Sequence, residues 1–141
     1  MFGRATGLKR TMAKLGSMIA AMAVAVDFIA RGASEDEWLM VLVEEGQWAQ
    51  PFEARLRMIQ ERLYGCIDAA IDGQLAAQFP ETLGKRIVVR LDCYDAPEPE
   101  VSGFFERFSE GALTSPEYRR ALTDSTYVSD LQFQLNLDTA R

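Results

Sequence analysis

Two stretches of the chain alternate apolar and polar residues with the two-residue period of a half-buried strand. In residues 85–95 the apolar set is Ile87, Val89, Leu91 and Cys93. In residues 128–138 the apolar set is Leu131, Phe133, Leu135 and Leu137. We predict a strand in each stretch.

Other stretches repeat apolar residues every three or four positions, which is typical of a helix with one buried face. In residues 52–78 these are Phe52, Leu56, Ile59, Leu63, Cys66 and Ala70, and they predict one long helix that Gly73 weakens and Pro80 ends. After the linker "APEPE" they are Val101, Phe104, Phe105 and Phe108, which we assign to the core. Pro116 suits the first turn of a further short helix.

The N-terminal part carries a third helical stripe: Leu8, Met12, Leu15, Ile19, Met22, Val26 and Ile29. Between Met18 and Ile29 this helix is apolar nearly all round, so either the rest of the domain or a second chain must enclose it. Only twelve uncharged residues, 15–26, occur in a row, whereas a bilayer span needs about twenty. A secretory signal cleaved near Ala25 is the alternative interpretation.

Residues 34–46 complete the predicted elements. Ser34 lies three residues before Glu37, the spacing of a capping box, and Gly46 suits a helix end, so we predict a helix over about 35–45. The 141 residues then form a single α+β domain. We expect three to five helices, two of them long and amphipathic, packed on a small antiparallel sheet with two strands.

Charged residues are distributed unevenly along the chain. The net charge is −6, but residues 1–31 sum to +4 and residues 32–141 to −10. An acidic body repels phosphate backbones, so we expect no direct nucleic-acid binding. Residues 1–14 form a basic segment, extended or partner-bound, whose candidate partner-contacting residues are Arg4, Lys9, Arg10 and Lys14.

The residue types exclude common catalytic chemistry. The chain has no histidine, which removes Ser-His-Asp and Cys-His catalysis and histidine-ligated zinc. No nucleotide-binding or hydrolase motif occurs, and we expect no cofactor and no metal. Cys66 and Cys93 are expected to be buried thiols, with one disulfide as the alternative. Asp68 and Asp72, four residues apart on a helix, are expected on a solvated face rather than at a cation.

These features favour a non-enzymatic protein. In size, acidity and lack of catalytic residues, the chain resembles small inhibitor, immunity and anti-defence proteins of bacteria and phages. We therefore expect a cytoplasmic module that occupies a basic site of a target protein, including that of a nucleic-acid-binding protein. The candidate contacts in the acidic body are Trp38, Trp48, Asp92 and Asp95, although solvation of both aspartates at a strand end is the simpler interpretation.

Two other functions remain open from the sequence. A structural subunit of a larger assembly, such as a phage or a secretion apparatus, would use the apolar N-terminal helix to contact its neighbours. A carboxylate-dependent enzyme would need an acidic cluster in a pocket. A homodimer through the N-terminal helix or through a sheet edge is compatible with both the protein-binding module and the assembly subunit.

Overall fold

The computed structural model describes residues 26–138. The predicted contacts Arg4, Lys9, Arg10 and Lys14, the signal alternative, and the helical stripe up to Met22 lie outside the described residues. Among residues 26–138, no helix combines the length and the apolar character that crossing a membrane requires. The elements in chain order are β1 (Phe28–Arg31), β2 (Glu37–Glu44), α3 (Glu53–Asp72), α4 (Gln74–Gln78), the short 3₁₀ helix η3 (Pro80–Thr82), β3 (Lys85–Tyr94), α5 (Glu98–Gly111), α6 (Pro116–Asp124) and β4 (Val128–Asp138).

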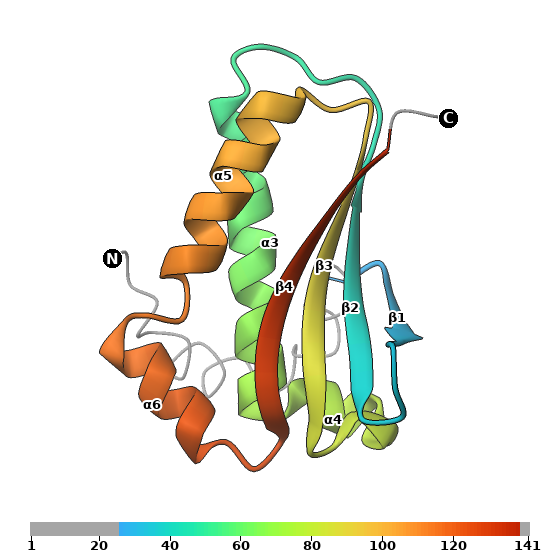
Figure 1. Cartoon of the computed structure of the whole chain (residues 1–141), viewed down its shortest axis with the longest axis vertical. Helices are drawn as coiled ribbons and strands as arrows, with labels where there is room; N and C mark the ends of the chain where they lie inside the picture. Colours follow the sequence, from blue (N-terminus) through green and yellow to red (C-terminus); the bar gives the residue numbers. More distant parts are fainter. Residues whose placement is uncertain (1–25, 139–141) are drawn as a thin grey trace.

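The four strands form one mixed sheet in the order β1-β2-β3-β4. β1 runs antiparallel to β2, whereas β2, β3 and β4 are parallel. Helix α3 connects β2 to β3, and α5 with α6 connects β3 to β4. These helices lie on one side of the sheet (Figure 1). The predicted α+β class is confirmed, but the predicted antiparallel sheet is wrong, because strands joined through helices run parallel.

The predicted helix over 35–45 is also wrong, because this stretch forms β2. The apolar run Trp38 to Val43 includes Met40, Val41 and Leu42, which are fully buried although their side chains alternate between the two faces. A strand that is buried on both faces carries apolar residues in succession rather than in alternation. The supposed capping pair instead closes the turn before β2, where Ser34 Oγ accepts from the Asp36 N–H (3.3 Å) and Glu37 Oε1 from the Ala33 N–H (2.8 Å).

The N-terminal stripe does not extend as a helix to Ile29, because residues Phe28–Arg31 form the edge strand β1. The long helix predicted over 52–78 is confirmed in large part as α3, which ends at Gly73 and is followed by the short α4. Gly73 has a φ of 94°, and a Cβ there would lie 2.8 Å from the Tyr127 ring. Both the left-handed conformation and the close ring therefore require glycine.

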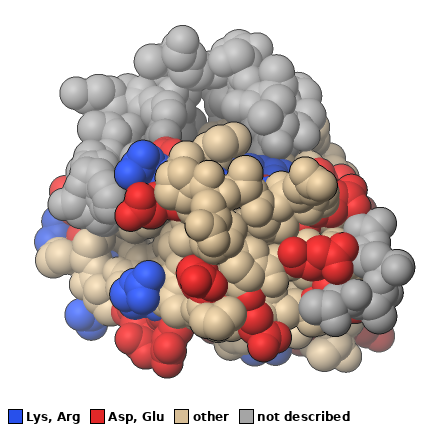
Figure 2. All heavy atoms as spheres, turned by 90° about the horizontal axis from the view of Figure 1, so that it is seen from above, with Lys and Arg blue, Asp and Glu red and all other residues tan. Residues whose placement is uncertain are grey.

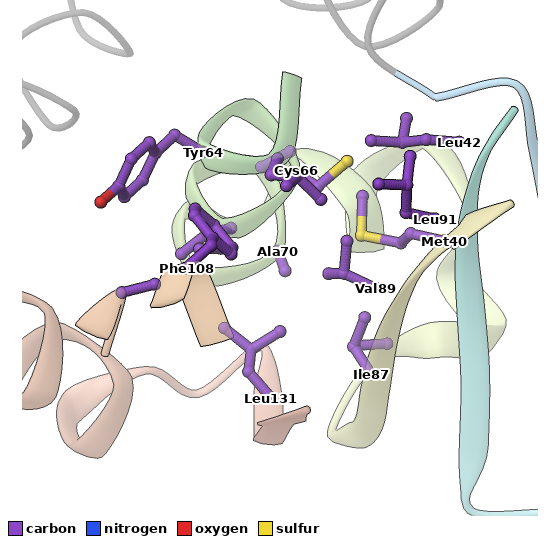
Figure 3. Close-up of a cluster of buried hydrophobic side chains, with 14 of the residues drawn as sticks. Met40, Leu42, Tyr64, Cys66, Ala70, Ile87, Val89, Leu91, Phe108 and Leu131 are labelled. Atoms are coloured by element: carbon purple, nitrogen blue, oxygen red, sulfur yellow. The ribbon is translucent and has the colours of Figure 1, made fainter. Parts of the chain in front are cut away.

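The core lies between the helices and the covered face of the sheet (Figure 3). The predicted strand over 85–95 is confirmed as β3, and its apolar set lies in the buried core. The strand is not half-buried as predicted, because Val88 and Asp92 on its other face are buried as well. The predicted strand over 128–138 and the predicted core phenylalanines of α5 are likewise confirmed. The buried residues drawn together are Met40 and Leu42 of β2, Ile87, Val89 and Leu91 of β3, Leu131 of β4, Tyr64, Cys66 and Ala70 of α3, and Phe108 of α5.

Candidate functional site at the carboxyl end of the sheet

Three of the predicted contact residues gather where the parallel strands end, at the top of Figure 1. Asp92 lies near the end of β3, Asp95 follows that strand, and the Trp48 indole N–H donates to the Tyr94 carbonyl oxygen (3.2 Å). Trp38, by contrast, lies near the start of β2, at the opposite end of the sheet. The carboxyl end of parallel strands is where open α/β sheets usually bind ligands.

Glu44, the last residue of β2, lies between two arginines of α3. Its Oε1 accepts from Arg55 Nε (3.0 Å) and Nη2 (2.9 Å), and its Oε2 accepts from Arg62 Nη1 (2.7 Å). The Glu44 side chain is only 13% exposed. Both oxygens are therefore engaged in fixing α3 to the end of β2.

Asp27 completes this arrangement, which we call the Glu44 clamp (Asp27, Glu44, Arg55 and Arg62). Asp27 Oδ2 accepts from Arg62 Nη2 (3.0 Å) and from the Val43 N–H (2.7 Å). Burial lowers the pKa of Arg62, but hydrogen bonds from its guanidinium to Asp27 and Glu44 outweigh burial and raise the pKa. The clamp contains two acids and two bases and so adds no net charge.

Arg55 also fixes the loop that follows β2. Its Nη1 donates to the Gln47 carbonyl (2.9 Å) and its Nη2 to the Glu45 carbonyl (2.7 Å). Its guanidinium carbon lies 3.8 Å from the centre of the Trp48 ring, a close cation–π contact. Trp48 is thus held between Arg55 and the Tyr94 carbonyl and orders the loop beside the strand ends.

The two predicted aspartates differ in their surroundings. Asp92 is 4% exposed, and Arg90 holds both of its oxygens, with Nε at 2.8 Å and Nη2 at 3.0 Å. Solvation at the strand end is therefore the wrong interpretation for Asp92, because Arg90 lies two residues earlier on the same face and neutralises it. Asp95 is exposed, with a φ of 54°.

The acidic pair of the long helix does not lie on a solvated face as expected. Asp68 is 8% exposed and accepts from the Tyr118 hydroxyl of α6 at 2.7 Å, so this carboxylate connects two helices. Asp72, at the end of α3, is half-buried. Within residues 26–138, no group of three or more cysteine, aspartate and glutamate residues is placed to hold a metal ion.

The two cysteines are buried and free, so the disulfide alternative is wrong. Burial raises the pKa of the Cys66 thiol to about 12. Burial likewise raises the pKa of Cys93 to about 12, with a further increase from Glu44 that Arg55 partly opposes. Both thiols therefore remain protonated at neutral pH, where a nucleophilic cysteine would need a lowered pKa.

Four exposed carboxylates lie at this end of the sheet, and we call them the acidic rim: Glu53, Asp95, Glu98 and Glu100. Glu53 opens α3, and Glu98 and Glu100 lie in the first turn of α5. Figure 2 looks onto this end and shows acidic side chains spread around an uncharged centre. Carboxylates at helix N-termini occupy the positions that would attract phosphate, so this end favours a cationic partner.

The sequence interpretation missed three members of the rim. Glu53, Glu98 and Glu100 each lie at or near the start of a helix that follows a strand. Once the parallel order is known, every such helix start meets the same end of the sheet. The helix starts could be located in the sequence. That they meet at one end of the sheet could be inferred only with β2 assigned as a strand.

Comparison of the chain with known proteins does not indicate a function for this site. No family model, curated protein or solved structure matches the chain significantly. The function is therefore inferred from the charge and geometry of the described residues.

Proposed function

We propose that this chain is a non-enzymatic protein-binding module, of the inhibitor, immunity or anti-defence type, which occupies a basic surface of a target protein through its acidic rim. The observation that supports this function is the presence of four exposed carboxylates at the same end of the sheet as a loop that the Glu44 clamp and Trp48 hold in place. A pre-ordered loop loses little conformational freedom when it binds.

The overall charge of the described residues supports the same function. Residues 26–138 contain twenty-one acidic and ten basic residues, a net charge of −11. A field of this size speeds encounter with a basic protein and disfavours nucleic acid. Salt should weaken the complex, because exposed charges are screened beyond about 10 Å at 0.1 M ionic strength.

The chemistry at this end favours recognition over catalysis. The carboxylates of Glu44 and Asp92 are each held by arginine, and the Cys93 thiol is protonated. The rim carboxylates, by contrast, are exposed and suit ion pairing with lysine and arginine.

Charge reversal within the rim tests this function. Full-length chain with Glu53→Lys and Asp95→Lys should bind a panel of lysine- and arginine-rich peptides at least about tenfold more weakly than the unaltered chain. The matched control is Glu106→Lys with Glu110→Lys, which makes the same charge change at exposed positions further along α5. The control should lose less than about threefold. Equal losses in the two variants would show binding by net charge alone and would contradict a site at the rim.

One observation favours a second candidate function, a structural subunit of a larger assembly. Strand β4 is an eleven-residue edge strand whose only described neighbour is β3. A long edge of this kind is a site for strand addition between chains.

A further inference from the structure

Strand β4 directs half of its backbone groups away from the sheet. The Asp138 carbonyl accepts from the Asp95 N–H (3.1 Å), so the N–H and C=O of Asp138 face β3. Backbone direction alternates along a strand, so the residues at odd positions face outward. These are Leu131, Phe133, Leu135 and Leu137.

This edge lacks the features that usually prevent strand addition, namely charge, proline, a bulge or short length. Residues 131–137 read "LQFQLNL", with no charge, proline or glycine. The register shift in the β3–β4 pair lies opposite Lys85 and Arg86, before Leu131. The edge over residues 131–137 therefore has a regular register and can accept another strand.

The side chains along this edge also leave apolar surface in contact with solvent. Phe133, Leu135 and Leu137 are only half-buried, although they lie on the face that the helices cover. A strand added beside β4 would place further apolar side chains next to them. Their partial exposure therefore favours a neighbour that alternates apolar and polar residues in the same way.

We propose that this neighbour is β4 of a second copy, added antiparallel about a two-fold axis at Gln134, to form a continuous eight-stranded sheet. In this register Leu131 pairs with Leu137 of the other copy and Phe133 with Leu135, so all four outward-facing residues form hydrogen-bonded pairs. Apolar residues face apolar residues on the covered side. Gln132 faces Asn136 on the other side, so the strand is complementary to itself.

Charge selects the antiparallel order. Parallel addition would bring the two acidic carboxyl ends together, whereas antiparallel addition places them at opposite ends of the dimer. It also brings α6 of one copy, with exposed Arg119 and Arg120, toward the first turn of α5 of the other, with exposed Glu98 and Glu100. Glu98 and Glu100 also belong to the acidic rim, but the pairing itself rests on the edge of β4 and not on the proposed function, and it leaves Glu53 and Asp95 free for a target.

A single engineered cysteine tests the register. In Gln134→Cys the two copies of residue 134 face each other directly as a non-hydrogen-bonded pair, with Cα atoms about 4.5 Å apart, within disulfide range. In the control Gln132→Cys the two copies of residue 132 lie four residues apart along the strands, about 13 Å. Mild oxidation of the full-length chain should cross-link the first variant and leave the second uncross-linked. Cys66 and Cys93 are buried and do not interfere.

A charge at the same position tests the pairing without a covalent bond. Gln134→Glu places a carboxylate beside Arg90 of β3, its cross-strand neighbour, so the fold of each copy should tolerate it. In the dimer two glutamates would face each other, and the dimer dissociation constant should rise about fivefold. Gln132→Glu makes the same charge change but faces Asn136, and should change the constant less than about twofold.

Sedimentation of the unaltered chain and the two glutamate variants, together with the cross-linking, gives distinct outcomes. A dimer that Gln134→Glu weakens and Gln134→Cys cross-links supports the proposal. A monomer at all concentrations would overturn it. A dimer that neither cysteine cross-links would overturn it as well, because the copies would then meet through another surface.

Discussion

The two edges of the sheet are built in opposite ways. Strand β1 has four residues, and the charged residue before it, Asp27, is tied to Arg62 and to the Val43 N–H. Strand β4 has eleven residues, with an uncharged stretch from Leu131 to Leu137. A short edge tied down by charge offers little to a new strand, whereas a long neutral edge offers a full row of backbone groups. The difference is the reason why we propose β4, and not β1, as the edge that pairs with a second copy.

Each edge also depends on a different kind of interaction with the helices. On the β1 side, the Glu44 clamp joins the start of β1 and the end of β2 to α3 through partly exposed ion pairs. On the β4 side, the buried hydrogen bond from Tyr118 to Asp68 joins α6 to α3. Removing each interaction in turn shows how far the two sides are stabilised independently.

The largest effect is expected at the clamp. Glu44→Ala leaves Arg55 and Arg62 close together without the carboxylate between them. We expect the free energy of unfolding to fall by about 3 kcal/mol, since the carboxylate that is removed is largely buried and is shared by two arginines. Urea denaturation measures this change. The control Glu106→Ala, exposed on α5, should stay within about 0.5 kcal/mol of the unaltered chain. An equal loss in both variants would contradict a special role for the clamp.

A smaller loss is expected on the β4 side. Tyr118→Phe removes only the hydroxyl that donates to the buried Asp68 carboxylate, and should lower the free energy of unfolding by about 2 kcal/mol. Tyr127→Phe is the matched control, because Tyr127 is 40% exposed. Its effect should be within about 0.5 kcal/mol. If Tyr118→Phe were as mild as its control, α6 would be held by packing alone.

The sequence predicted the elements whose apolar residues recur with a regular period. The helical spacing in α3 and α5 and the alternation in β4 follow from burial on one side, and the structure has these elements. Strand β3 was also predicted, because Arg90 and Asp92 keep its second face polar in sequence although Val88 and Asp92 are buried. Strand β2 buries apolar residues on both faces, so its sequence is a continuous apolar run, which carries no period. Its capping-box spacing then favoured a helix, and without β2 the parallel order of the sheet could not be inferred.

The candidate site was predictable to a smaller extent. Asp95 and Trp48 follow strand ends, and their grouping could be expected once those strands were known. The burial of Asp92 had a local signal in Arg90, two residues earlier. The burial of Asp68 had none, because its partner Tyr118 lies fifty residues further along the chain. Contacts of that kind depend on how helices pack, which local patterns do not record.

Amide hydrogen exchange as a function of protein concentration tests the difference between the two edges most directly. The outward-facing amides of Phe133 and Leu135 should exchange more slowly as concentration rises, because pairing with a second copy protects them. The outward-facing amides of Ile29 and Arg31 in β1 should show no dependence on concentration. Exchange at Phe133 and Leu135 that is equally fast in dilute and concentrated samples would contradict an open β4 edge that pairs with its own copy.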